Sequence, residues 1–449
     1  MNRRITRSCM GLASLALIAG GVTGQTISRA SVSSAGAEAN AHTPMRSTAL
    51  GVSGDGRFVA FLSGASNLVP GDTNGVEDAF VHELATGMTE RVSVSTAGAQ
   101  ALADSYGRGC FDVAISGDGR YVSFSTAGTK LIVGEKGGGR RVDVYVRDRV
   151  AGITERVSVS TSGGAPNGDS SYASISADGR YLAFYSYASN LVANDRNRTT
   201  DVFVRDRVSR TTVRASVGSA GGEGNGSSLL TTNSALSADG RCVIFVSSAS
   251  NLVSGDTNGT TDVFVRDLVA GTTERVNLTA AGGQLAGGVT LGSQSISGNG
   301  RFATYVYRST DPSELPPDVP VGSYHAYQFD RVAHTTACVS RGPSGEPANA
   351  GVGIGVGSSA DGRYLAFVSR STNLLPGFPG TVSGVFLRDN VTGLVGLVSQ
   401  GLGGSLPNGS SWAMQVALDA TGTTVVFGSE ATNLVSGDTN GLRDVFVLR

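Results

Sequence analysis

The sequence predicts an all-β protein, a closed seven-bladed β-propeller of four-stranded antiparallel blades. Three observations predict it: a motif that recurs at a regular interval, the strand-like runs within each copy, and a match between the two ends of the chain. The composition agrees, because glycine fills 64 of the 449 positions and charged residues make up only 16 %. This glycine content is about twice the usual share, as expected for a chain with many tight turns.

A turn motif, Ser-x-Asp-Gly-Arg, recurs along the chain. Copies begin at Ser53, Ser116, Ser176, Ser237, Ser297 (with Asn for Asp) and Ser359, and a degraded seventh copy begins at Asp419. The glycines of these turns are separated by 63, 60, 61, 60, 62 and 60 residues. One aromatic residue follows each glycine by five positions and a second follows it by 24 to 27. Such regular copies indicate a repeat fold in which neighbouring units bury their shared faces.

Each copy contains four strand-like runs. The Asp-Gly turn joins the first two, for example 171–176 and 180–186, which is a strong hairpin pattern. In the first copy a longer loop leads to a third run at 78–84, and a second tight turn leads to a fourth at 89–95. The fourth run alternates between apolar and polar residues, as a half-buried strand does. Four antiparallel strands, repeated seven times, are typical of a β-propeller.

The two ends of the chain together complete one blade. The seventh copy stops after its third run, and residues 27–36 (ISRASVSSAG) match the fourth-run residues 89–98 (TERVSVSTAG). We therefore expect the N-terminal segment to supply the missing strand, because closing the ring removes exposed strand edges. An open array with frayed ends is the alternative. On this interpretation residues 25–449 form a single domain.

The N-terminus predicts export. Arg3, Arg4 and Arg7 precede an uncharged stretch from Gly11 to Val22, and small residues follow as far as Gly24. This order is typical of a secretory signal peptide, which we assign to residues 1–24. The apolar stretch is shorter than the roughly 20 residues that a membrane span requires. We expect a soluble product in the periplasm or outside the cell, with no transmembrane segment.

The charge balance argues against nucleic acid as a partner. The formal net charge is −1, and a dedicated nucleic-acid binder needs a basic face. No nucleophile elbow, phosphate loop or metal-binding histidine pair is present in the sequence. A catalytic site assembled from several blades would leave no such local motif, so an enzyme stays open as an alternative.

The text S-x-D-G-R-[FY]-[LV]-A-F occurs in full at 53–61, 176–184 and 359–367. It resembles the repeat of the TolB-like (PD40-type, WD40-like) β-propellers of exported bacterial proteins. The resemblance covers residues 27–449 and implies a propeller fold and export. The chain departs from that family in lacking a proline before the Asp-Gly turn, in blade count, and in having no separate N-terminal α/β domain. Partnership with the Tol–Pal envelope system is therefore not carried over.

An acidic motif recurs in the loop between the second and third runs. Its residues are Asp72, Asn74 and Asp78; Asp195, Asn197 and Asp201; Asp256, Asn258 and Asp262; and Asp438, Asn440 and Asp444. Oxygen ligands at alternate positions around a tight turn are how calcium loops are built, which makes calcium the one candidate cofactor. The alternative is an Asx-turn in which Asp and Asn cap the backbone. Copies two, five and six lack the motif, so a site common to all blades is excluded.

Two further features bear on partner binding. Arg-Asp pairs end several third runs, at 147–148, 205–206, 266–267 and 388–389, and we interpret them as solvated edge charges that blunt strand pairing. Three loops abandon the repeat: the basic loop 134–141, and the proline-containing loops 311–317 and 376–380. Loops that depart from a repeat are where a binding face tends to be individualised.

We accordingly expect a monomeric, exported, non-catalytic binding or scaffold propeller. It would engage an envelope or extracellular protein, or alternatively a glycan, through loops on one face. Two other functions stay open: a carbohydrate-active hydrolase or lyase with its site in the central funnel, and a calcium-stabilised surface or adhesive module.

Overall fold

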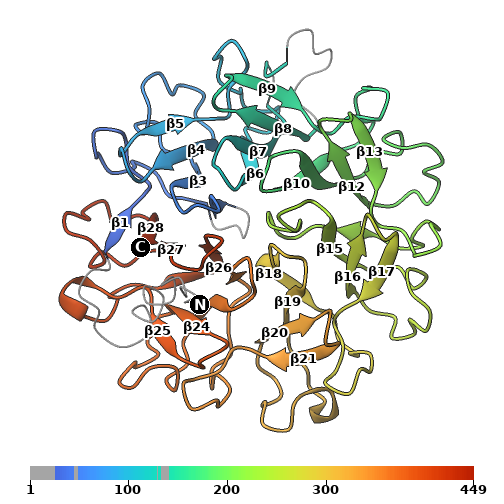
Figure 1. Cartoon of the computed structure of the whole chain (residues 1–449). Coiled ribbons are helices and arrows are strands. Elements are labelled where there is room, and N and C mark those ends of the chain that lie inside the picture. Colours follow the sequence, from blue (N-terminus) through green and yellow to red (C-terminus); the bar gives the residue numbers. More distant parts are fainter. Residues whose placement is uncertain (1–25, 45–48, 129, 133–140) are drawn as a thin grey trace, which may run out of the picture.

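Seven four-stranded antiparallel sheets are arranged as blades around a central axis, which confirms the predicted fold (Figure 1). The computed structural model describes residues 26–44, 49–128, 130–132 and 141–449. The predicted signal peptide lies outside the described residues. In the part of the chain that is described, no helix is long and apolar enough to cross a membrane.

Each blade contributes one strand to each of four concentric layers. The innermost strands are β2 (Leu50–Val52), β6 (Cys110–Ile115), β10 (Ser170–Ile175), β14 (Ser228–Leu229), β18 (Thr290–Ile296), β22 (Val356–Ser358) and β26 (Ser411–Leu418). The second strands are β3 (Phe58–Ser63), β7 (Tyr121–Thr126), β11 (Tyr181–Ser186), β15 (Cys242–Ser247), β19 (Phe302–Tyr307), β23 (Tyr364–Ser369) and β27 (Val425–Ser429).

The outer half of each blade follows the same order. The third strands are β4 (Asp78–Glu83), β8 (Asp143–Asp148), β12 (Asp201–Asp206), β16 (Asp262–Asp267), β20 (His325–Asp330), β24 (Gly384–Asp389) and β28 (Asp444–Leu448). The outermost strands are β5 (Thr89–Arg91), β9 (Ile153–Arg156), β13 (Thr211–Arg214), β17 (Thr272–Arg275), β21 (Thr335–Cys338), β25 (Val395–Leu397) and β1 (Ile27–Arg29). Two short 3-10 turns, η2 (Pro312–Glu314) and η3 (Leu402–Gly404), lie in loops.

The N-terminal strand closes the ring, as the sequence predicts. In Figure 1 the blue strand β1 lies beside the red C-terminal strand β28. The two are antiparallel, with Ile27 opposite Leu448 and Arg29 opposite Phe446. The outer edge of the last blade is thus occupied by a strand from the other end of the chain.

The recurring aromatic residues form the core of each blade. The two aromatics of every copy face each other across the second and third strands, as Phe61 faces Phe80 with 5.7 Å between ring centroids. All seven pairs are buried and stacked, with centroid distances between 5.7 and 6.2 Å. This explains why both positions keep an aromatic side chain, since such pairs add about 0.5–1.5 kcal/mol beyond the area that they bury.

The antiparallel order gives the ring two different faces. The Asp-Gly turns and the second tight turns lie together on one face, which we call the turn face; there Leu84 N donates to Arg57 O. The loops between second and third strands and the crossings between blades lie on the opposite face, which we call the long-loop face; there Cys110 N donates to Glu77 O over 2.7 Å.

A continuous ring of backbone hydrogen bonds joins all seven blades at the turn face. The residue after the first Ser (or Asp) of each turn is Gly or Ala, and its carbonyl accepts an N–H from a neighbouring turn over 2.8 to 3.1 Å. The small residues are required by close approach, because a Cβ on Gly117 would lie 3.1 Å from Ala177 O. Contact between neighbouring blades therefore restricts the x position of Ser-x-Asp-Gly-Arg to Gly or Ala.

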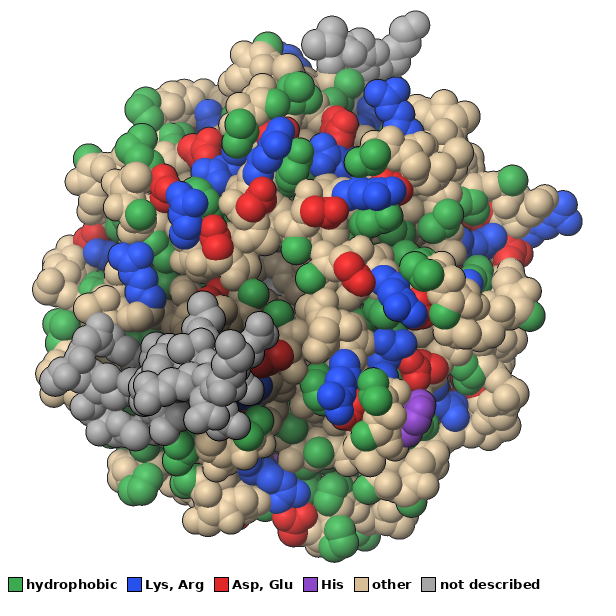
Figure 2. Space-filling view, in the orientation of Figure 1, with side chains coloured by type: hydrophobic (Ala, Val, Ile, Leu, Met, Phe, Trp, Pro, Cys, Tyr) green, Lys and Arg blue, Asp and Glu red, His purple; other side chains and the backbone are tan. Residues whose placement is uncertain are grey.

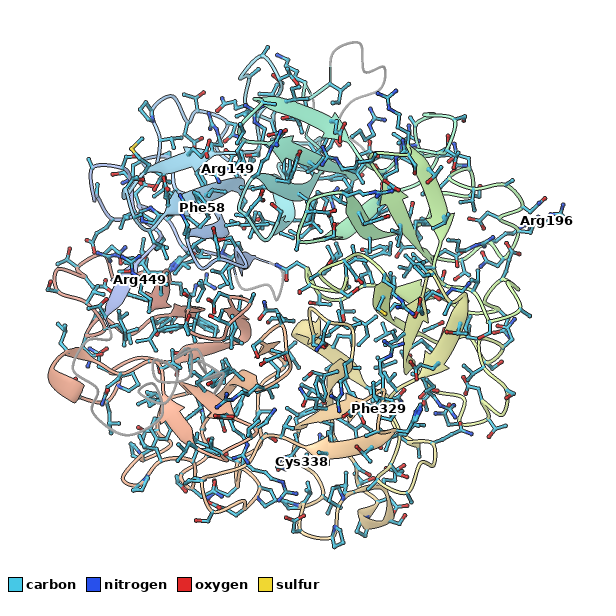
Figure 3. All side chains as sticks on the ribbon, viewed as in Figure 1. Phe58, Arg149, Arg196, Phe329, Cys338 and Arg449 are labelled. Atoms are coloured by element: carbon cyan, nitrogen blue, oxygen red, sulfur yellow. The ribbon has the colours of Figure 1, made fainter. Side chains whose placement is uncertain are left out.

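The aromatic residue that follows many of these turns packs against the glycine of the next blade. Gly119 has a φ of +73°, and a Cβ there would lie 2.2 Å from the ring of Phe58. Arg149 covers the same ring, with its guanidinium carbon 4.4 Å from the ring centroid (Figure 3).

We expect Gly119→Ala to destabilise the protein far more than Gly87→Ala. Gly87 has nearly the same φ, +72°, but has nothing within 4 Å of an added Cβ. Both substitutions incur the left-handed backbone cost of about 1–2 kcal/mol. Only Gly119→Ala adds overpacking against Phe58, of about 1–3 kcal/mol. Urea unfolding of the two variants measures the difference, and equal midpoints would contradict this account of the blade interface.

The Arg-Asp pairs differ from the sequence interpretation, which took them as solvated edge charges. Arg147 donates from Nη1 to Ser95 O of the preceding blade and to Thr154 Oγ1, and Arg205 is only 8 % exposed. Asp148 instead binds Arg120 in a two-bond pair of 2.7 and 3.0 Å, which holds the pKa of Asp148 down at about 2. The interpretation was wrong because a side chain at a strand end in a propeller faces the neighbouring blade rather than solvent.

Candidate functional site

The acidic loops bind an arginine of their own blade. In the first copy, Arg91 Nη1 lies 3.1 Å from Asp72 Oδ1 and 3.4 Å from Asp78 Oδ2. Asn74 Nδ2 donates to Asp78 Oδ2 over 2.7 Å, and Asn74 Oδ1 accepts from Val76 N over 3.3 Å. The guanidinium therefore lies between the two carboxylates, while the asparagine organises the turn.

The same arrangement occurs in the three other copies that carry the motif. Their Arg–Asp distances run from 3.1 to 3.5 Å, for Arg214 with Asp195 and Asp201, Arg275 with Asp256 and Asp262, and Arg29 with Asp438 and Asp444. The asparagines Asn197, Asn258 and Asn440 each donate to the last Asp of their motif. The arginine comes from the outermost strand in every case, so the last blade takes Arg29 from β1.

Burial has the largest effect on the pKa values of the aspartates in these loops. The side chains of Asp72 and Asp78 are 5 % and 1 % exposed, and burial raises the pKa of both, opposed by Arg91. Among the described residues, no group of three or more His, Cys, Asp or Glu could hold a metal ion. A calcium ion in these loops would compete with the arginine for the same carboxylate oxygens, and the calcium assignment stays a prediction.

The loops that abandon the repeat are partly described. Residues 133–140 of the basic loop lie outside the described residues, and of its predicted span only Arg141 is described; its Nη1 donates to Pro166 O over 2.6 Å. In the 311–317 loop, Glu314 accepts from Tyr307 and from Ala286 N over 2.5 Å each. In the 376–380 loop, Phe378 is buried and contacts Phe386 edge-on at 5.2 Å.

Two cavities that are lined by described residues lie on the long-loop face. A water-sized cavity of about 10 Å³ is lined by three tyrosines (Tyr305, Tyr307 and Tyr327) and by Glu314 and Pro316, among others. A larger pocket of about 350 Å³ lies between the first two blades, where Gly75, Glu77, Arg108 and Phe111 are among its walls. No motif in the sequence marks Arg108; the one sign of an unusual crossing there is the 63-residue spacing, the longest between successive turns.

Side chains also link the inner segments of different blades across the centre of the ring. Asn233 in the fourth blade donates from Nδ2 to Leu50 O over 2.8 Å and to Val113 O over 2.7 Å. Gln294 in the fifth blade exchanges two hydrogen bonds with the backbone of Leu418 in the seventh, of 2.7 and 2.9 Å. These amides tie blades that are not neighbours in the ring to one another.

A buried carboxylate, Asp112, lies on the innermost strand β6. It is 0 % exposed and accepts hydrogen bonds from Ser125 and from Tyr172 N, the latter over 2.9 Å. Tyr172 has a φ of +57°, unusual for an aromatic residue, and Asp112 holds this bulge of β10 in place. The arrangement gives Asp112 a structural role between the second and third blades.

These features define a seven-bladed propeller whose turn face is uniform and whose long-loop face differs from blade to blade. On the face in view in Figure 2, Lys and Arg side chains alternate with Asp and Glu around the centre, so neither sign of charge dominates. No protein-family model matches the sequence, and no curated protein matches it.

Solved structures of similar fold include propellers of very different kinds. Oligogalacturonate lyase from Vibrio parahaemolyticus is 10 % identical with a TM-score of 0.51, over 91 % of this chain and 90 % of that one. The β-propeller domain of the Trilobed protease from Pyrococcus furiosus is 11 % identical with a TM-score of 0.50, over 91 % and 95 %. That domain has an open velcro topology, whereas β1 closes the ring here.

TolB is also among the structural neighbours. TolB from Acinetobacter baumannii is 13 % identical with a TM-score of 0.39, over 71 % of this chain, and this chain spans only 58 % of that TolB. At such identities the likeness concerns the fold alone. The lyase and the protease domain, with TM-scores of 0.51 and 0.50, support the propeller fold that the repeat predicts, and none of these structures assigns an activity.

Proposed function

We propose that this chain is an exported, non-catalytic binding propeller that engages a protein partner through its long-loop face. The observation that carries the proposal is the contrast between the two faces. The turn face repeats one motif in six blades, with a degraded copy in the seventh, and is tied into a single backbone ring. The long-loop face holds the two cavities described above and the loops 311–317 and 376–380, which depart from the repeat. A uniform frame that presents one individualised face suits recognition of a partner.

A catalytic site in the central funnel has less support. Asn233 and Gln294 reach across the centre of the ring and bind the backbone of blades that are not their neighbours. The buried carboxylate of Asp112 accepts hydrogen bonds that hold the β10 bulge, which is a structural use of the group. We also propose a monomer, because β1 pairs with the strand edge of the last blade.

Replacement of one loop tests the proposal. Residues 308–324 of the fifth blade would be exchanged for residues 248–261, the corresponding loop of the fourth blade. The immobilised domain would be offered envelope extract, and each retained protein would be purified and its Kd measured. We expect the exchange to weaken binding and Val332→Thr, an exposed change on the turn face, to leave it unchanged. A partner lost with Val332→Thr but not with the exchange would overturn the assignment of the face.

A further inference from the structure

The pocket between the first two blades is built around an arginine that is held in place. Asp104 Oδ2 accepts from Arg108 Nε over 2.6 Å, and Asp104 Oδ1 accepts from the backbone N–H groups of Tyr106 and Arg108, over 2.8 Å each. Asp104 N also donates to Arg108 O over 3.0 Å. These bonds close residues 104–108 into a tight loop and fix the direction in which the side chain leaves it.

Aromatic rings restrict the guanidinium further. Its carbon lies 5.1 Å from the ring centroid of Tyr106 and 5.2 Å from that of Phe111. The side chain is nonetheless 45 % exposed. Arg108 is thus positioned before any ligand arrives, which lowers the conformational entropy lost on binding.

The hydrogen bonds of Arg108 differ from those of the turn-face arginines. Arg120, Arg180, Arg301 and Arg363 each use both Nε and Nη2 on one carboxylate. Arg108 uses only Nε, because Oδ1 of Asp104 already accepts two backbone donors. Within the described part of the chain, its Nη1 and Nη2 make no hydrogen bond. Two parallel N–H donors at the edge of a fixed guanidinium match a carboxylate.

The crossing that carries Arg108 differs from most of the other crossings, so the fold does not require the Asp104–Arg108 loop. Five other crossings are held by an asparagine clasp, such as Asn167, which accepts from Ser189 N while Asn190 Oδ1 accepts from Asn167 N. The clasp residues are Asn40, Asn167, Asn225, Asn349 and Asn408. The Asp104–Arg108 loop stands in place of the clasp and adds a pocket wall.

The other residues that line the pocket restrict which ligand groups can bind there. Gly64, Gly75, Gly107 and Gly109 contribute backbone rather than side chains, so a ligand can approach polar main-chain groups closely. Glu77 lines the pocket too. A carboxylate oxygen of Glu77 can accept from ligand hydroxyls. The volume of about 350 Å³ is at the lower end of ligand pockets.

We propose that this pocket binds an acidic sugar unit, with the carboxylate on Nη1 and Nη2 of Arg108 and the hydroxyls on Glu77 and the glycine backbone. This site lies on the same long-loop face as the proposed partner site but needs no protein partner. It involves none of residues 308–324, so either proposal can fail without the other.

Titration of the folded protein with glucuronate, glucose and N-acetylglycine, followed by NMR, tests the proposal. We expect saturable binding of glucuronate, with glucose and N-acetylglycine at least about tenfold weaker, since each offers only part of the recognised chemistry. Arg108→Gln should weaken glucuronate binding at least about tenfold, and Arg108→Lys should not restore it, because lysine lacks the planar fork.

Arg301→Gln is the matched control, because Arg301 is also 45 % exposed and paired with an aspartate, but on the turn face. It should bind glucuronate like the parent. Thermal melts of all variants show whether a loss of binding reflects unfolding. Equal binding of N-acetylglycine would overturn the sugar assignment in favour of a simple carboxylate site. No binding of glucuronate, or binding unchanged in a folded Arg108→Gln variant, would overturn the site itself.

Discussion

Replacing Arg91 by glutamine lowers the free energy of unfolding by about 3–5 kcal/mol, because it leaves two buried carboxylates without their counter-ion. Asp72 and Asp78 flank the guanidinium at 3.1 and 3.4 Å and are almost wholly buried. Urea denaturation near neutral pH measures the loss. Arg57→Gln, at an exposed pair with Glu83, is the control and should cost less than about 1 kcal/mol.

The loss in Arg91→Gln should shrink as the pH falls. Burial already raises the pKa of Asp72 and Asp78, and without arginine nothing opposes this rise. A folded-state pKa above the unfolded value means that the folded state binds more protons, so lowering the pH favours folding. A constant difference between variant and parent from neutral pH to mildly acidic pH would contradict the buried-carboxylate account.

The same variant decides whether the acidic loops take calcium. Without the guanidinium, Asp72, Asn74 and Asp78 present oxygens that a calcium ion can share. If calcium binds in the parent, its melting temperature will be higher in millimolar calcium than in EDTA, and Asp72→Asn will abolish the gain. If calcium raises the melting temperature of Arg91→Gln alone, the Arg91 guanidinium occupies the position of the ion in the parent. If neither responds, the calcium prediction is wrong.

Features repeated in every blade could be predicted from the sequence, and features that occur once could not. The aromatic pair recurs in all seven copies, so its spacing predicts that Phe61 lies opposite Phe80. The closing strand is predicted by the match between the two ends of the chain, which places β1 beside β28. The acidic motif was found because it is repeated in four blades. Its arginine partner was not, because Arg91 lies 13 residues beyond Asp78 on another strand.

Single-copy contacts across the ring leave no trace in a single sequence. Asn233 reaches Leu50 O from 183 residues away, and Gln294 reaches Leu418 from 124 residues away. Arg108 is positioned by local contacts, yet its exposed edge becomes apparent only when both oxygens of Asp104 are accounted for. The candidate pocket therefore required the structure, whereas the frame that supports it did not.

Deleting residues 26–31 should lower the melting temperature by more than about 10 °C, relative to a chain that begins at Thr26. Two losses combine. The unpaired edge of β28 becomes exposed, since β1 no longer covers it. Asp438 and Asp444 also lose Arg29, which lies 3.2 Å from each of them, and Asp444 loses the hydrogen bond from Ser31 Oγ.

A peptide of residues 26–36 added in trans should restore much of the stability, because it can add the missing strand to β28. A peptide with Arg29→Gln is the matched control and should restore less, since it pairs with the strand but leaves both carboxylates without a counter-ion. Differential scanning calorimetry with increasing peptide concentration measures the recovery, which should follow mass action. A truncated chain that melts like the parent would show that the ring does not depend on β1 for closure, and the last blade would then be stable with three strands.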